Sequence, residues 1–197
     1  IHHLKNKDGE TDSEGDVPAK LTAAGAKVYK YDNMEKLAEW IEAAAKAAPD
    51  GYTTAIVAAS FLFNPALIKK LPFDTVKDFT PLGLVVDIPT SVTVHPSLPV
   101  KNVKDLIALA KTKPGELFYS SSGPGTVGHL AGELLKQKTG IDIVHVPYRG
   151  GSLSANDVAG GHIGTAFLSF SAAAPLLSSG RIKVLAVVEK TRYAAIP

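Results

Sequence analysis

The amino-acid sequence predicts an α/β protein built around a parallel β-sheet. From residue 102 onward, short β-prone runs alternate strictly with runs that have the apolar spacing of a helix. Clusters of Gly, Pro and Ser separate these runs and mark the turns between them. Because consecutive parallel strands need a crossover connection, this βαβαβ order indicates a sheet with helices on both faces.

Composition narrows the class of protein. The 197 residues are 45% hydrophobic and 20% charged, which is ordinary for a globular protein with a sizeable core. The formal net charge is only +2, from 21 basic and 19 acidic residues without a basic run, so no nucleic-acid partner is suggested. Without cysteine there are no disulfides or thiolate metal sites, and no apolar stretch approaches the roughly 18 residues of a membrane span.

The N-terminal half is expected to form a looser series of elements. Asn33 is placed to cap a helix, and Asn64 with Pro65 suits the N-cap and first position of another. The predicted elements are a flexible arm over residues 1–18, a strand over 26–31, a helix over 34–48, a buried strand over 53–59, a helix over 65–70 and two β-rich runs within 82–94. A boundary between two lobes is expected near residues 96–100.

The C-terminal half carries the alternating pattern. Asn102 and Asp105 have the spacing of a capping box, and Gly140 is placed as the residue that ends a helix. The predicted helices cover residues 103–111, 127–139, 152–159 and 171–178, and the predicted strands cover 117–119, 143–146, 162–168 and 182–188.

The loop after the first of these strands is the strongest candidate for a binding site. It contains Ser121, Ser122, Gly123, Gly125 and Thr126. The helix that follows begins with N–H groups that have no partner inside the helix, and its dipole favours an anion there. Glycines let a ligand approach the backbone, and hydroxyls add hydrogen bonds. We therefore predict an anion cradle; the alternative that Thr126 only caps its own helix stays open.

Other strand ends carry similar side chains. Ser60 follows the predicted strand at 53–59, Tyr148 and Gly150 follow the strand at 143–146, and Ser169 follows the strand that ends at residue 168. In open parallel sheets, ligands bind outside the carboxyl ends of the strands. Hydroxyls and glycines at those ends bind a small anion without attacking it.

Catalytic and metal-binding motifs are missing from the sequence. There is no G-x-S-x-G, no H-E-x-x-H and no G-K-[ST], so we predict a protein that is not an enzyme and has no catalytic residue. His129 and Glu133 lie one helical turn apart, but no third ligand is close in sequence, so we predict no metal site. No cofactor is predicted.

A dinucleotide site is the main alternative. Residues 123–128 read G-x-G-x-x-G between a strand and a helix, the pattern of a dinucleotide-binding oxidoreductase domain. Pro124, however, removes a backbone N–H that could face a phosphate. The expected acidic residue is also displaced, because Asp142 precedes the next strand instead of ending it.

Several longer motifs resemble those of one family. They are Ala47-Ala48-Pro49-Asp50-Gly51-Tyr52-Thr53, Asn64-Pro65-Ala66-Leu67, Val76-Lys77-Asp78-Phe79-Thr80-Pro81, Val94-His95-Pro96-Ser97-Leu98-Pro99, His129-Leu130-Ala131-Gly132-Glu133 and Val144-His145-Val146-Pro147-Tyr148-Arg149-Gly150. In this order they resemble the Bug (TctC-like) family, the extracytoplasmic solute receptors of tripartite tricarboxylate transporters. The resemblance covers about residues 43–197.

This resemblance implies a two-lobed, periplasmic-binding-protein-like (type II) fold of the Venus-flytrap kind. Such a receptor works in the periplasm, holds a carboxylate between its lobes and presents it to membrane transporter subunits. It implies a partial first lobe over residues 19–98, after the arm at 1–18, and a second α/β lobe over 99–197. The first lobe is expected to be incomplete or altered, because residues 1–42 do not match the family's opening strand and Pro/Gly-rich loop. Many members carry Asp near Leu168, and its loss favours plain carboxylates over amino acids.

Overall fold

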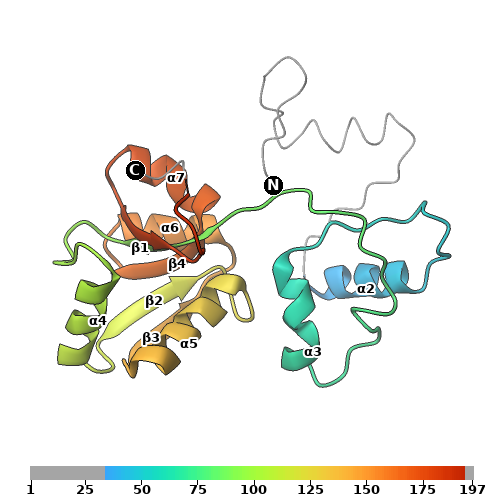
Figure 1. Cartoon of the computed structure of the whole chain (residues 1–197), viewed down its shortest axis with the longest axis horizontal. Coiled ribbons are helices and arrows are strands. Elements are labelled where there is room, and N and C mark those ends of the chain that lie inside the picture. Colours follow the sequence, from blue (N-terminus) through green and yellow to red (C-terminus); the bar gives the residue numbers. More distant parts are fainter. Residues whose placement is uncertain (1–33, 194–197) are drawn as a thin grey trace, which may run out of the picture. The chain divides into compact units, whose positions relative to one another are not determined.

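The computed structural model describes residues 34–193 (Figure 1). The chain divides into two compact units, residues 1–56 and 57–197, which are treated separately. In the first unit, α2 (Met34–Ala45) forms where a helix was predicted. The predicted arm, the strand at 26–31 and the Asn33 cap lie outside the described residues.

A five-stranded mixed sheet forms the centre of the second unit. Its strands are β1 (Thr90–Val94), β2 (Leu117–Ser121), β3 (Ile143–Pro147), β4 (Thr165–Ser169) and β5 (Lys183–Val187), in the spatial order β3-β2-β4-β1-β5. β2 pairs in parallel with β3 and β4, whereas β1 is antiparallel to both β4 and β5. The prediction of an α/β fold is confirmed, but a purely parallel sheet is wrong because β1 inserts between β4 and β5 in the opposite direction.

Four helices connect these strands: α4 (Val103–Thr112), α5 (Val127–Thr139), α6 (Gly151–Ala159) and α7 (Phe170–Ser178). Each lies within two residues of its predicted bounds. Asn102 caps α4, its Oδ1 accepting a hydrogen bond from the Asp105 N–H at 2.9 Å, and Asp105 in turn accepts from the Lys101 N–H at 2.9 Å. Gly140 ends α5 in the left-handed conformation, with φ 69°, as predicted.

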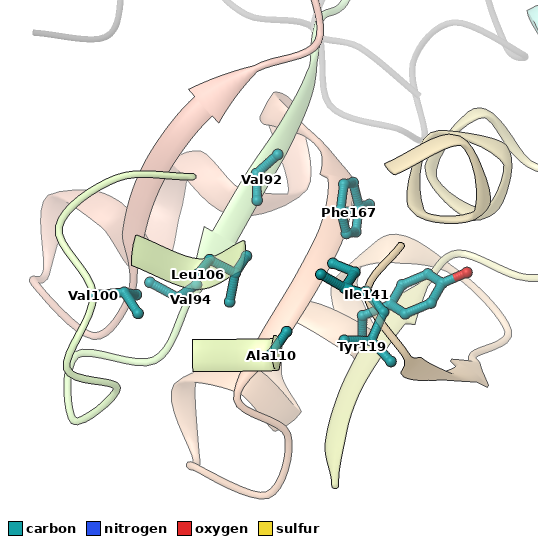
Figure 2. Packing of buried hydrophobic residues seen from close by; sticks show 9 residues of the cluster. Val92, Val94, Val100, Leu106, Ala110, Tyr119, Ile141 and Phe167 are labelled. Atoms are coloured by element: carbon teal, nitrogen blue, oxygen red, sulfur yellow. The ribbon is translucent and has the colours of Figure 1, made fainter. Parts of the chain in front are cut away.

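Two apolar clusters cover the two faces of the sheet. In the first, the β1 residues Val92 and Val94 pack with Tyr119 of β2 and with side chains of α4 (Figure 2). The second joins β4 to α6 and α7, with Leu168 only 1% exposed. Figure 1 accordingly shows α6 and α7 on one side of the sheet and α4 and α5 on the other. Burial of apolar surface stabilises the fold by about 25 cal/mol per Å² and holds the helices against the sheet. The positions of the strand ends are fixed as a result.

The segment before β1 differs from prediction. Residues 53–58 form no strand and are exposed, and of the β-rich region 82–94 only β1 is extended and paired. A short 3₁₀ helix, Ala59–Phe63, runs into α3 (Asn64–Leu67), which ends earlier than expected. A strand is stabilised by cross-strand pairs, and within the described residues nothing pairs with 53–58. The division into an arm and lobes at 18/19 and 98/99 stays a prediction.

Candidate ligand-binding site

The carboxyl ends of β2, β3 and β4 lie together at one edge of the sheet. β2 and β4 are neighbours, but the chain leaves β2 through α5 toward β3 and returns through α6 to β4. This reversal is a topological switch point, where open α/β sheets bind ligands. Of the predicted site residues, Ser121 and Ser169 end β2 and β4, and the Tyr148 N–H donates to the Ser121 carbonyl at 3.1 Å.

Hydrogen bonds within the loop and to the start of α5 hold the loop from residue 122 to 126 in place. Thr126 is the N-cap of α5, and its Oγ1 donates to the Gly123 carbonyl at 2.7 Å while accepting from the His129 N–H at 3.4 Å. The Gly125 N–H, with φ 73° at that residue, donates to His129 Nδ1 at 3.1 Å. Thr126 therefore caps its own helix, while a ligand contact by Thr126, Gly123 or Gly125 stays a prediction.

Ser121 lies beneath this loop and is fully buried. Its Oγ accepts from the Gly123 N–H at 3.2 Å and lies 2.7 Å from His145 Nε2. The same Oγ also donates to the Gly123 carbonyl at 3.1 Å, so these three contacts lie inside the fold, and a contact between Ser121 and a ligand stays a prediction.

The hydroxyls of Ser122 and Ser169 both lie near the first residue of α6. A Cβ placed on Gly151 would be 3.2 Å from Ser122 Oγ and 3.8 Å from Ser169 Oγ. Gly150 is the N-cap of α6, with φ 123°, a conformation that favours glycine and leaves no side chain to cap the helix. Ser169 makes no side-chain cap at α7 either, both caps lying in the described part of the chain. The first N–H groups of α6, which have no partner inside the helix, thus lie near two hydroxyls.

Tyr148 is held from the side of α6. Its hydroxyl donates to Asp157 Oδ2 at 2.5 Å, and its ring packs on the second apolar cluster. Partial burial, reinforced by this bond to a carboxylate, raises the pKa of Tyr148 to about 12, so the phenol is neutral at physiological pH. Tyr148 is therefore held in place by its hydroxyl, ring and backbone N–H, and its contact with a ligand stays a prediction.

Two further predicted features take less direct positions. Ser60 lies in the 3₁₀ helix and is half-buried, and its role opposite the cradle stays a prediction. Leu168 is buried in the second cluster, so it cannot contact a ligand, and the argument from its missing carboxylate no longer applies. Among the described residues, no group of three or more His, Asp or Glu is placed to hold a metal ion.

His129 and His145 are the site residues that sequence reasoning missed. The sequence analysis considered His129 only as a metal ligand and gave His145 no role of its own. Their rings stack with centroids 4.2 Å apart, below the loop. The spacing of His129 four residues after Gly125 was the available signal, because a side chain there can reach back to the N–H groups that precede its helix.

The comparisons with known proteins identify the family of this chain. Residues 40–197 match the model of the tripartite tricarboxylate transporter family receptor, TctC. The chain belongs to this family. A UPF0065 protein of Bordetella bronchiseptica is 34% identical over 79% of this chain and 46% of its own length. BugT of Bordetella pertussis is 29% identical over 79% of this chain and 48% of its own length.

Solved structures show the same fold. The protein Rpa4515 of R. palustris, solved with adipate, is 34% identical, covers 96% of this chain and 65% of its own, and superposes with a TM-score of 0.74. MatC of Rhodopseudomonas palustris, with bound malate, is 26% identical over 79% of this chain and 52% of its own, with a TM-score of 0.66. The TctC receptor chain thus has an α/β, periplasmic-binding-protein-like fold, and it spans about half the length of the curated relatives it matches.

The dinucleotide alternative is not supported. The third glycine of its motif, Gly128, serves packing, since a Cβ there would lie 2.2 Å from the Phe167 carbonyl oxygen. The Gly123 and Gly125 N–H groups, which would face a pyrophosphate, form hydrogen bonds inside the fold.

No helix among the described residues is long and apolar enough to cross a membrane.

Proposed function

We propose that this chain acts in a periplasmic receptor that binds a small carboxylate and delivers it to the membrane subunits of a tripartite tricarboxylate transporter. One observation carries the proposal: the start of α6, without a side-chain cap, lies close to the hydroxyls of both Ser122 and Ser169. N–H groups at a helix start favour negative charge, and hydroxyls add donors to a carboxylate oxygen. The adipate and malate bound by related proteins support a carboxylate as the ligand.

The predicted cradle is revised accordingly. Ser122, Gly150 and Ser169 are proposed to contact the carboxylate, with Ser60 facing them, whereas Ser121, Gly123, Gly125 and Thr126 are proposed to hold the loop in shape. Binding then favours a closed arrangement of the lobes by shifting an existing equilibrium between open and closed forms. No chemical step is required, so the protein is proposed not to be an enzyme.

Calorimetry with adipate, malate, citrate, acetate and NADPH tests the proposal. Ser122→Ala and Ser169→Ala are each expected to weaken carboxylate binding roughly tenfold, since a hydrogen bond to a charged group contributes about 1.5 kcal/mol or more. Ser178→Ala is the matched control, because that hydroxyl is exposed at the far end of α7 and bonds to the Pro175 carbonyl at 3.0 Å.

Three results would contradict the proposal. Unchanged carboxylate affinity in Ser122→Ala and Ser169→Ala would show that these two hydroxyls do not bind the ligand. Binding of NADPH without binding of any carboxylate would support the dinucleotide alternative instead. Conversion of a bound carboxylate into a product would show an enzyme.

A further inference from the structure

Two stacked histidines hold the loop from beneath. The His129 ring, on α5, and the His145 ring, on β3, have centroids 4.2 Å apart and planes 26° apart. His129 Nδ1 accepts from the Gly125 N–H at 3.1 Å, and His145 Nε2 lies 2.7 Å from Ser121 Oγ. The histidine pair therefore contacts Ser121, which directly precedes the loop at residues 122–126, and Gly125 within it.

The two contacts respond differently to a proton. A ring nitrogen that accepts from an N–H carries no hydrogen, so His129 is neutral in this structure, with its hydrogen on Nε2. A hydrogen added to Nδ1 would face the Gly125 N–H, and the hydrogen bond would be lost. Ser121 Oγ donates its one hydrogen to the Gly123 carbonyl at 3.1 Å, so His145 Nε2 can donate to this oxygen whether its ring is neutral or charged. Only the His129 contact depends on the neutral ring.

The surroundings limit the charge of the pair. The neighbouring ionisable groups are Glu133 and Lys136 of α5 and Tyr119 of β2, while β4 contributes none. The Tyr119 hydroxyl donates to Glu133 Oε1 at 2.7 Å, and Lys136 Nζ lies 3.1 Å from the same oxygen. Burial, and then the nearby His129, lower the pKa of His145. Two stacked imidazolium rings would repel, so the pair takes one proton more readily than two.

We propose that His129 is a positioning residue for the ligand loop and makes ligand affinity pH-dependent, holding Gly125 when neutral and releasing it when protonated. This inference rests on the proposed function. An imidazole changes charge between about pH 5 and 8. Although an imidazolium attracts a carboxylate, Glu133 lies one helical turn away and offsets the added charge. Loss of the hydrogen bond between Gly125 and His129 therefore determines the direction of the pH dependence, and carboxylate affinity falls as the pH falls.

The pH-dependent hydrogen bond between the Gly125 N–H and His129 is called the latch below. Three variants separate this latch from a purely structural role of His129. His129→Asn places Oδ1 near the position of Nδ1, so it accepts from Gly125 but does not titrate. It is expected to bind adipate up to about threefold more weakly than the wild type at pH 8, and with the same affinity at pH 6 as at pH 8. His129→Leu removes the acceptor and is expected to bind about three- to tenfold more weakly at both pH values. His145→Gln keeps a polar group near Ser121 and is expected to retain the pH dependence.

The test measures adipate affinity by calorimetry at pH 8, 7 and 6, where its carboxyl groups remain ionised. Wild-type affinity is expected to fall about three- to tenfold over this range. In parallel, the Gly125 amide resonance is followed by ¹⁵N–¹H NMR without ligand, and it is expected to move with the His129 ring signals in the wild type but not in His129→Asn.

The two readouts distinguish failure of the latch from failure of the proposed function. If no carboxylate binds at any pH while the Gly125 amide still follows His129, the latch is real and the receptor proposal is wrong. If adipate binds with an affinity that does not depend on pH, or if His129→Asn keeps the wild-type dependence, the latch is overturned. A Gly125 amide that does not respond to pH overturns it as well.

Discussion

Gly128→Ala is expected to destabilise the second unit because α5 packs directly on β4. A Cβ at this position would lie 2.2 Å from the Phe167 carbonyl oxygen and 3.1 Å from its carbonyl carbon. A carbon and a carbonyl oxygen approach each other to about 3.3 Å at closest, so helix and strand must separate by roughly 1 Å. Replacing glycine by alanine inside a helix gains about 1 kcal/mol of propensity, but overpacking against a rigid backbone costs about 1–3 kcal/mol and sometimes more.

We expect overpacking to outweigh propensity and lower the free energy of unfolding by about 2 kcal/mol, which for a chain of this size lowers Tm by roughly 4–8 °C. Urea unfolding followed by circular dichroism measures the change. Gly83→Ala is the control, because no atom lies within 4 Å of its added Cβ. A Gly128→Ala protein as stable as wild type, or more stable, would refute the reasoning that this glycine is required by close helix–strand packing.

Two further predictions concern stability. Asn102→Ala is expected to cost about 1 kcal/mol in urea unfolding through loss of the α4 cap, whereas Asn102→Asp should cost little; equal losses would contradict the capping role. Although partial burial alone raises the pKa of Glu133, hydrogen bonds from Tyr119 and Lys136 outweigh it and lower that pKa. Glu133 thus stabilises the fold above its unfolded pKa, and this contribution disappears as the pH falls through the lower folded value. Tyr119→Phe should flatten the decline in Tm between pH 5 and 3, and an unchanged slope would count against the bond.

Local signals predicted much of the second unit. The helix Val127–Thr139 followed from apolar spacing, and both of its ends followed from capping chemistry at Thr126 and Gly140. Residues three and four apart decide such features, so they can be recognised in the sequence alone. The same holds for the strand ends that bring Ser122 and Ser169 to one edge of the sheet, because parallel strands joined by helices place their carboxyl ends together.

The direction and place of β1 could not be predicted in this way. Its five residues are β-prone, but only pairing with the distant β4 and β5 sets it antiparallel between them. Residues 53–58 show the converse, since an apolar run with no partner in the described structure forms no strand and stays exposed. Strand propensity reflects packing against neighbours, and those neighbours come from elsewhere in the chain.

The sequence by itself determined the α/β class, the helix ends, the edge of the sheet that carries the site, and the family to which the chain belongs. Tertiary structure decided which of the predicted site residues have their hydrogen bonds made inside the fold. Ser121 and Thr126 are occupied by His145, Gly123 and the start of α5, whereas Ser122 and Ser169 lie near the start of α6. The physical reason is that a hydroxyl has few hydrogen bonds to give, and only the folded neighbours determine whether they are already made.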